Sequence, residues 1–413
     1  MRLKRSELLD FSIWVLVAFY ALVGHWIWFG RGIQETIMIA LMLAAIVSRS
    51  SRKIKMSEIP TLLVLLIWIC IIGVSTVFSK NMGYLRSNMS AMAGGLLAFV
   101  YLCQFFTQQK ERCTKYMSTA LKLLTYYMVI NSLIILIQNR VPYFLMNRDA
   151  LASVNNTYYH DQLTGFIGIN GTTRWNILSC AVILINISQA IQKKNRRQMI
   201  FVSVFTIVSV YIALLNGARA FLVVLPVSLL VYFFVIRKVK LQTKFKYLLL
   251  LIALCFGLVL LYFADDYLFT EISALIDDKV LLYLSGDIQQ MIASNDDRAR
   301  AVNYALLHGG LLGKGIGFAP MHFSTGDVKY MGLNSTSSYI YLTGVLGYGV
   351  LTWLFAALSS KMIRAGWIVW SVFVMVFLAF SYLLPLYSSI VLMFGVGMIV
   401  LIFSLDVVAD NKK

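Results

Sequence analysis

Residues 294–317 read SNDDRARAVNYALLHGGLLGKGIG, and they lie within the one long polar passage, residues 264–333, of an otherwise apolar chain. Ser294 followed by Asp297 predicts a helix N-cap with an acid in the first turn. The glycine pair that begins at Gly309 predicts the end of the same helix. This stretch therefore predicts a short capped helix in a polar setting.

The two arginines of this helix are expected to face different ways. Gly309 follows Arg298 by eleven residues, which is about three turns at 3.6 residues per turn, so the two share a face. Arg300 comes two residues after Arg298 and points roughly the opposite way. If this helix lines a site, one arginine of the pair faces it and the other does not.

The composition excludes a soluble protein. Of the 413 residues 60% are hydrophobic and 13% are charged, and the mean hydropathy is +0.78, which is typical of a polytopic membrane protein. The net charge of +18 comes from basic clusters in short loops, which indicates membrane topology rather than nucleic-acid binding.

The apolar stretches predict an all-α fold with about twelve transmembrane helices. Each stretch reaches or approaches the roughly 20 residues that span hydrocarbon, and they lie near 11–29, 33–47, 60–78, 89–106, 119–137, 175–191, 199–215, 220–236, 247–263, 336–358, 367–384 and 386–405. By the positive-inside rule the basic loops are cytoplasmic, so both termini are expected inside. The outer face then receives loops at 79–88, 138–174 and 264–334, the corner at 216–220 and a turn at Pro385.

The corner NGARA at 216–220 carries Arg219 at the outer boundary of the membrane. An arginine at that depth is costly unless it snorkels or meets an anion, so the residue is either an interfacial anchor or a phosphate ligand. Together with Arg298 it would suit a lipid-linked diphosphate, because each guanidinium makes bidentate hydrogen bonds to phosphate oxygens.

The glycine-rich turn around Lys314 has two interpretations. Its amides could cradle phosphate, or the turn could merely re-enter the membrane surface, and the spacing is not that of a dinucleotide or P-loop fingerprint. The five cysteines contain no CxxC pair and no paired metal-ligand spacing occurs, so neither a metal nor another cofactor is expected. Five outer-face side chains are unranked candidates for a base: His160, His308, His322, Asp161 and Asp327.

Residues 200–357 contain NGARA at 216–220, a large outer loop, an arginine-led helix closing in LLGKGIGF at 311–318, and LNS at 333–335 followed by TSSYIYLTGVLGYGV. In this order the motifs resemble those of the O-antigen polymerase and ligase superfamily. The Arg298-to-Gly309 spacing is similar to the arginine-to-glycine motif of the polymerases' outer loops, and LTGF at 163–166 followed by Asn170 is a weaker point of similarity.

One departure favours a polymerase over a ligase. Members of the ligase branch carry a histidine before the asparagine that opens the helix near Ser335, whereas this chain has Leu333 before Asn334. The resemblance therefore implies a Wzy-type repeat-unit polymerase, a metal-independent GT-C glycosyltransferase in the bacterial cytoplasmic (inner) membrane, active at its periplasmic or extracellular face. It would join undecaprenyl-diphosphate-linked oligosaccharides into O-antigen or capsular polysaccharide. The ligase and, as another class, a lipid-linked oligosaccharide flippase or transporter remain alternatives.

The resemblance also implies site residues, partners and regions. Arg219 and Arg298 would be catalytic. The expected ligands of the diphosphate or glycan are Arg300, Lys314, Asn334, Arg86 and Lys80. The partners would be a lipid-linked donor and acceptor in the bilayer, with a chain-length regulator and a flippase of the same pathway. The regions would be an N-terminal transmembrane region at 1–199, a polymerase-like core at 200–358 and a C-terminal hairpin with a tail at 359–413.

Overall fold

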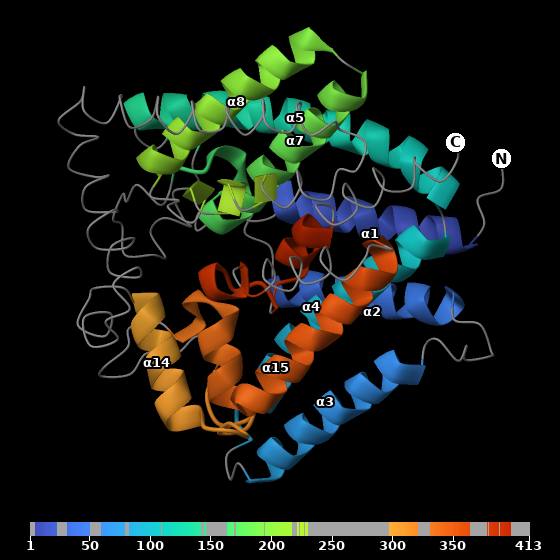
Figure 1. The fold of residues 1–413 in the computed structure, drawn as a ribbon, viewed down its shortest axis with the longest axis vertical. Coiled ribbons are helices and arrows are strands. Elements are labelled where there is room, and N and C mark those ends of the chain that lie inside the picture. The colour runs from blue at the N-terminus through green and yellow to red at the C-terminus, as the bar shows by residue number, and fades with distance from the viewer. Residues whose placement is uncertain are drawn as a thin grey trace, which may run out of the picture.

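The structure is a computed structural model in which every regular element of the described residues is helical. It describes residues 5–22, 31–49, 59–78, 82–108, 110–141, 144–145, 163–168, 171–193, 195–216, 221–222, 224–226, 228–229, 297–320, 331–363, 378, 380–387 and 389–397. Figure 1 shows two groups of helices, α5, α7 and α8 in one and α3, α4, α14 and α15 in the other, with α1 and residues 380–397 between them.

The first group is built around α7 (Thr172–Lys193), which packs against α5 (Lys110–Arg140) and α8 (Arg196–Leu215). Nearly every side chain of α7 from Trp175 to Ala190 is buried, including the polar Asn176 and Asn186, as expected for a central helix. Asn195 caps α8, because its Oδ1 accepts hydrogen bonds from the Arg197 and Gln198 amides at 3.1 and 3.4 Å.

The helices α1 (Arg5–Leu22), α2 (Arg31–Arg49) and α4 (Leu85–Gln108) pack against one another. The sequence predicted that the first helix begins near residue 11, but it begins at Arg5 because a polar contact holds its first turns. Buried Asp10 forms an ion pair with Arg49, and the Tyr101 hydroxyl donates to the same carboxylate at 2.9 Å. The Arg49 guanidinium also lies over the Tyr101 ring, 5.2 Å from its centroid.

The second group contains α3 (Ile59–Phe78), α14 (Asp297–Gly309) and α15 (Ser335–Ile363). The sequence predicted one continuous helix near 336–358, but α15 is broken at Gly344, whose backbone is non-helical at φ 76° and ψ 173°. The first half, Ser335–Thr343, lies beside α14, and the second half runs from Val345 to Ile363 along α3 and α4 (Figure 1).

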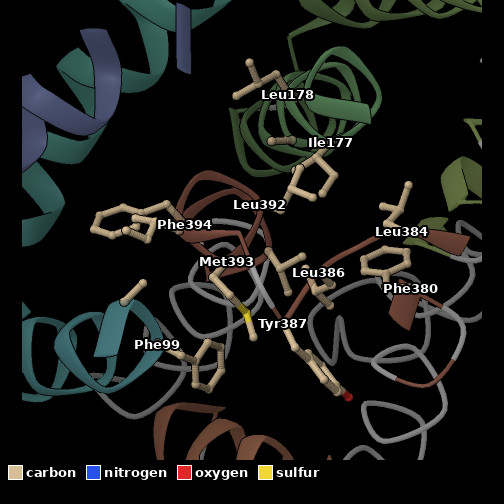
Figure 2. Packing of buried hydrophobic residues seen from close by; sticks show 14 of the residues in the cluster. Phe99, Ile177, Leu178, Phe380, Leu384, Leu386, Tyr387, Leu392, Met393 and Phe394 are labelled. Carbon is tan, nitrogen blue, oxygen red and sulfur yellow. The ribbon is translucent and has the colours of Figure 1, made fainter. Parts of the chain in front are cut away.

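Residues 380–397 connect the two groups. Figure 2 shows Leu392 and Met393 between Ile177 of α7 and Phe99 of α4. A Cβ on Gly95 of α4 would overlap the Tyr387 carbonyl, so the backbones touch there. The helical turn at 380–383 ends before Pro385 and a helix resumes at 390, as the sequence predicted.

A buried hydroxyl network ties this segment to both halves of α15. The Tyr348 hydroxyl lies 2.9 Å from Thr336 Oγ1 and 2.6 Å from Ser381 Oγ, and the Thr352 and Tyr387 hydroxyls are 3.0 Å apart. Buried hydroxyls of this kind stabilise a structure because each one has a partner.

The chain is a membrane protein. Three described helical segments are long and apolar enough to cross a bilayer, namely Leu85–Phe105, Arg196–Leu215 and Ser335–Ser359, and Leu63–Val77 is a shorter apolar helix. The helix α15, which contains the third segment, is broken at Gly344, and its second part, Val345–Ile363, has 19 residues that rise about 28 Å. That length matches a hydrocarbon layer of about 30 Å.

Candidate functional site: the shared start of two parallel helices

The first turns of α14 and α15 lie side by side. Arg298 Nε donates to the Leu383 carbonyl at 3.3 Å, and the Ser335 amide donates to the next carbonyl, that of Leu384, at 3.1 Å. The Ser335 hydroxyl accepts a bond from the Tyr387 amide at 2.8 Å, which closes the contact. Residues 383–387 therefore hold the starts of both helices together.

The two helices then run parallel (Figure 1). Ala301 and Ala305, on the face of α14 that joins Arg298 to Gly309, are fully buried. A Cβ on Gly309 would come within 2.5 Å of the Ile340 carbonyl oxygen, so only glycine allows this approach. The face predicted from the eleven-residue spacing is thus the one that packs on α15.

This arrangement makes one end of the pair electropositive. A helix carries about half a positive charge at its N-terminus, and here two N-termini lie together. Arg298 and Arg300, both half-buried, add guanidinium groups in the first turn of α14. Asp297 belongs to the same turn, and its carboxylate suits the positive end of the helix dipole.

Asn334 adds a buried hydrogen-bond donor at the same end. Its Oδ1 caps α15 by accepting from the Ser337 amide at 2.7 Å, and its side chain is fully buried. Its Nδ2 has no acceptor among the residues that the structure describes. A buried donor without a partner costs about 1–3 kcal/mol, and a ligand oxygen would remove this cost.

The glycine-rich turn at the other end of α14 forms hydrogen bonds with the backbone groups on either side of the break in α15. Interrupting a helix leaves carbonyls before the break and amides after it without intrahelical partners, up to four of each, and two of each bond to the turn here. The carbonyls of Tyr341 and Leu342 accept from the amides of Lys314 and Gly315, both at 2.9 Å. The amides of the two residues after Gly344 donate to the Gly310 and Leu311 carbonyls, at 3.1 and 3.2 Å.

These bonds argue against the interpretation in which the backbone amides of the turn cradle a phosphate. The Lys314 and Gly315 amides already donate to α15, so they are not arranged to cradle a phosphate. The Lys314 side chain is exposed. Asn88 of α4 anchors the turn on its other side, because its Nδ2 donates to the Ile316 and Ala319 carbonyls, both at 2.7 Å.

A second polar centre surrounds the LTGF segment. The 3₁₀ turn η3 (Gly165–Ile167) is held by Asn131 of α5, whose Oδ1 accepts from the Phe166 amide at 2.7 Å. Gln138 Oε1 accepts from the Gly165 amide at 3.0 Å. Asn216, the first residue of the corner at 216–220, donates to the Leu163 carbonyl at 3.2 Å. The LTGF segment and this corner are therefore linked.

The structure separates the predicted site residues into two sets and leaves others outside its scope. Arg298, Arg300 and Asn334 lie at the shared helix start. Lys314, Arg86 and His308 lie toward the opposite end of α14, and all three are exposed. The His308 ring is tilted by 39° against the Tyr304 ring, with 4.2 Å between the ring centroids. Six of the predicted site residues lie outside the described ones: Lys80, His160, Asp161, Arg219, His322 and Asp327. The predicted N-cap Ser294 also lies outside them.

Sequence reasoning missed three buried amide side chains that hold the glycine-rich turn and the LTGF segment: Asn88, Asn131 and Gln138. The available signal was a lone amide within an apolar helix, which must find a partner once buried. Across the part of the chain that the structure describes, no three His, Cys, Asp or Glu side chains gather as metal ligands would.

The chain was compared with family models, with curated proteins and with solved structures. No family model matches the chain, and neither the curated proteins nor the solved structures compared with it gave a significant match.

Proposed function

We propose that the chain is a GT-C-type glycosyltransferase that polymerises undecaprenyl-diphosphate-linked oligosaccharides at the outer face of the bacterial cytoplasmic membrane. In this proposal about twelve helices cross the membrane and both termini are cytoplasmic. The observation that carries the proposal is the electropositive end shared by α14 and α15, where Arg298 meets two helix N-termini. A diphosphate has the charge and the oxygen acceptors that such an end would bind.

The reaction needs charge stabilisation more than a strong acid. The acceptor hydroxyl oxygen bonds to the anomeric carbon of the donor glycan while the bond from that carbon to the diphosphate breaks. The diphosphate takes the electron pair, and its growing charge is met by Arg298 and the helix dipoles. Asn334 Nδ2 would donate to a ligand oxygen, and Arg219 would supply a second guanidinium.

The hydroxyl proton passes to a base that lies near the anomeric carbon. His308 is ten residues along α14 from Arg298, which is about 15 Å. We therefore place the base among the other candidates, which are His160, Asp161, His322 and Asp327.

The test is chain elongation by arginine variants in a strain that lacks the chromosomal copy. Arg298→Ala and Arg219→Ala are expected to abolish elongation, and Arg300→Ala to reduce it less, with each protein retained in the membrane. Arg298→Lys keeps the charge but loses the fork of donors, so it is expected to recover only part of the activity. Normal long polymer from the Arg298→Ala strain would overturn the proposal.

The glycan of the deletion strain separates the three activities. A single repeat unit on the acceptor indicates a lost polymerase. Full-length polymer retained on carrier lipid indicates a lost ligase. Single lipid-linked units accumulating in the cytoplasm indicate a lost flippase.

A further inference from the structure

The end of α14 away from Arg298 carries an exposed apolar surface. This leucine patch comprises Leu306, Leu307, Leu311, Leu312 and Phe318, whose exposed fractions are 46, 72, 65, 41 and 42%. Adjacent leucines with this much exposure are unusual on a surface that faces water. All five belong to the end of α14 and the turn that follows it, within residues 306–318.

Basic side chains border the leucine patch. His308 and Lys314 are exposed within the same stretch. Arg86, also exposed, is the second residue of α4. The start of α4 is held to the glycine-rich turn after α14 by a bond from the Tyr84 amide to the Gly317 carbonyl at 3.3 Å. Leucines bordered by lysine and arginine are typical of a surface that lies in the headgroup layer of an anionic membrane.

The contact with α15 sets the depth of the patch. The Leu311 carbonyl accepts from the Leu346 amide at 3.2 Å, next to the similar bond between Gly310 and Val345. Val345 and Leu346 begin the straight 19-residue part of α15 and are 44 and 43% exposed. Because that part is about as long as the hydrocarbon layer is thick, its first residues and the leucine patch share one depth, at the edge of the hydrocarbon.

We propose that the leucine patch is a lipid-binding surface that seats the end of α14 in one leaflet of the bilayer. Acyl chains surround the leucines, and the phosphates of anionic headgroups bind Lys314 and Arg86. The backbone at Leu311 is bonded to the exposed start of the second part of α15, which favours bilayer lipid over a protein partner. The proposal is independent of the glycosyl transfer proposed above.

Photocrosslinking tests the occupant. The full chain with benzoylphenylalanine in place of Leu307 is reconstituted into vesicles of phosphatidylcholine and phosphatidylglycerol and irradiated. The expected product is a protein–lipid adduct, seen by intact mass, with a yield similar to that from the same probe at Val204. Val204 is 55% exposed in the middle of the apolar segment Arg196–Leu215 and provides the matched control. A dimer product, or no adduct at 307 while 204 reacts, overturns the proposal.

A second measurement tests the headgroup charge. One basic residue near a charged surface contributes about 1 kcal/mol, or roughly fivefold in relative affinity. Lys314→Gln and Arg86→Gln are therefore each expected to lower the ratio of phosphatidylglycerol to phosphatidylcholine adducts about fivefold. Added inorganic phosphate should leave the ratio unchanged. An unchanged ratio in both variants, or competition by free phosphate, overturns the role assigned to the headgroups.

Discussion

Replacing Gly344 by alanine tests the break in α15 and its repair by the glycine-rich turn. At φ 76° and ψ 173° the residue occupies a region that is essentially confined to glycine, and another residue there costs about 1–3 kcal/mol. The new Cβ would also overlap the Leu311 carbonyl. Moving the turn away breaks at least the two nearest cross bonds, at about 0.5–1.5 kcal/mol each. The sum is about 2–6 kcal/mol.

The assay is reversible unfolding of the purified protein in mixed micelles, compared with two glycine controls. Gly349→Ala meets no atom within 4 Å and lies inside the second half of α15, so it should be neutral or stabilising by up to about 1 kcal/mol. Gly310→Ala also meets open space but has φ 62°, so it should cost about 1–2 kcal/mol. If Gly344→Ala and Gly349→Ala unfold alike, the explanation of the break is wrong.

Three further substitutions probe the buried polar contacts. Asn88→Ala leaves two buried carbonyls of the glycine-rich turn without their donor, so it should destabilise by about 2–4 kcal/mol in the same unfolding assay, with Asn88→Asp no better because the donor is still missing. Asp10→Asn removes the carboxylate that pairs with the buried Arg49 charge and should cost about 3–5 kcal/mol. The substitution at the other partner, Arg49→Met, removes the cation and leaves the carboxylate. If both variants are as stable as the wild type, the pairing is contradicted. Gly165→Ala places a Cβ against the Asn131 side chain at φ 64°, and limited proteolysis should then cut the LTGF segment faster than in the wild type.

Much of the helical layout could be predicted because it depends on local properties of the chain. Long apolar runs fixed α3, α7 and α8 to within a few residues, and the glycine pair after His308 ended α14 where expected. The shared face of Arg298 and Gly309 followed from helical periodicity alone. The start of α1 was missed because it depends on Arg49, which lies 39 residues away in sequence.

The break in α15 could not be predicted either, because it also depends on residues that are distant in sequence. Gly344, Gly347 and Gly349 are three glycines in one apolar run, and a glycine inside a helix is tolerated at about 1 kcal/mol. What singles out Gly344 is the turn that begins at Gly309, whose carbonyls and amides replace the missing helix bonds. The role of Asn88 is hidden similarly, since its partners are 228 and 231 residues away.

The break explains how a membrane helix comes to start beside Arg298. An unbroken α15 of 29 residues would be about 44 Å long, well beyond a hydrocarbon layer of about 30 Å, and its N-terminus would project away from α14. Turning the chain at Gly344 instead folds the first nine residues, Ser335–Thr343, alongside α14, so that both positive ends meet at residues 383–387. The glycine-rich turn therefore affects the site from the far end of α14. It supplies the hydrogen bonds that the broken helix lacks, and so holds two parallel helices together although their dipoles repel each other. That pair of helices is what would bind an anion.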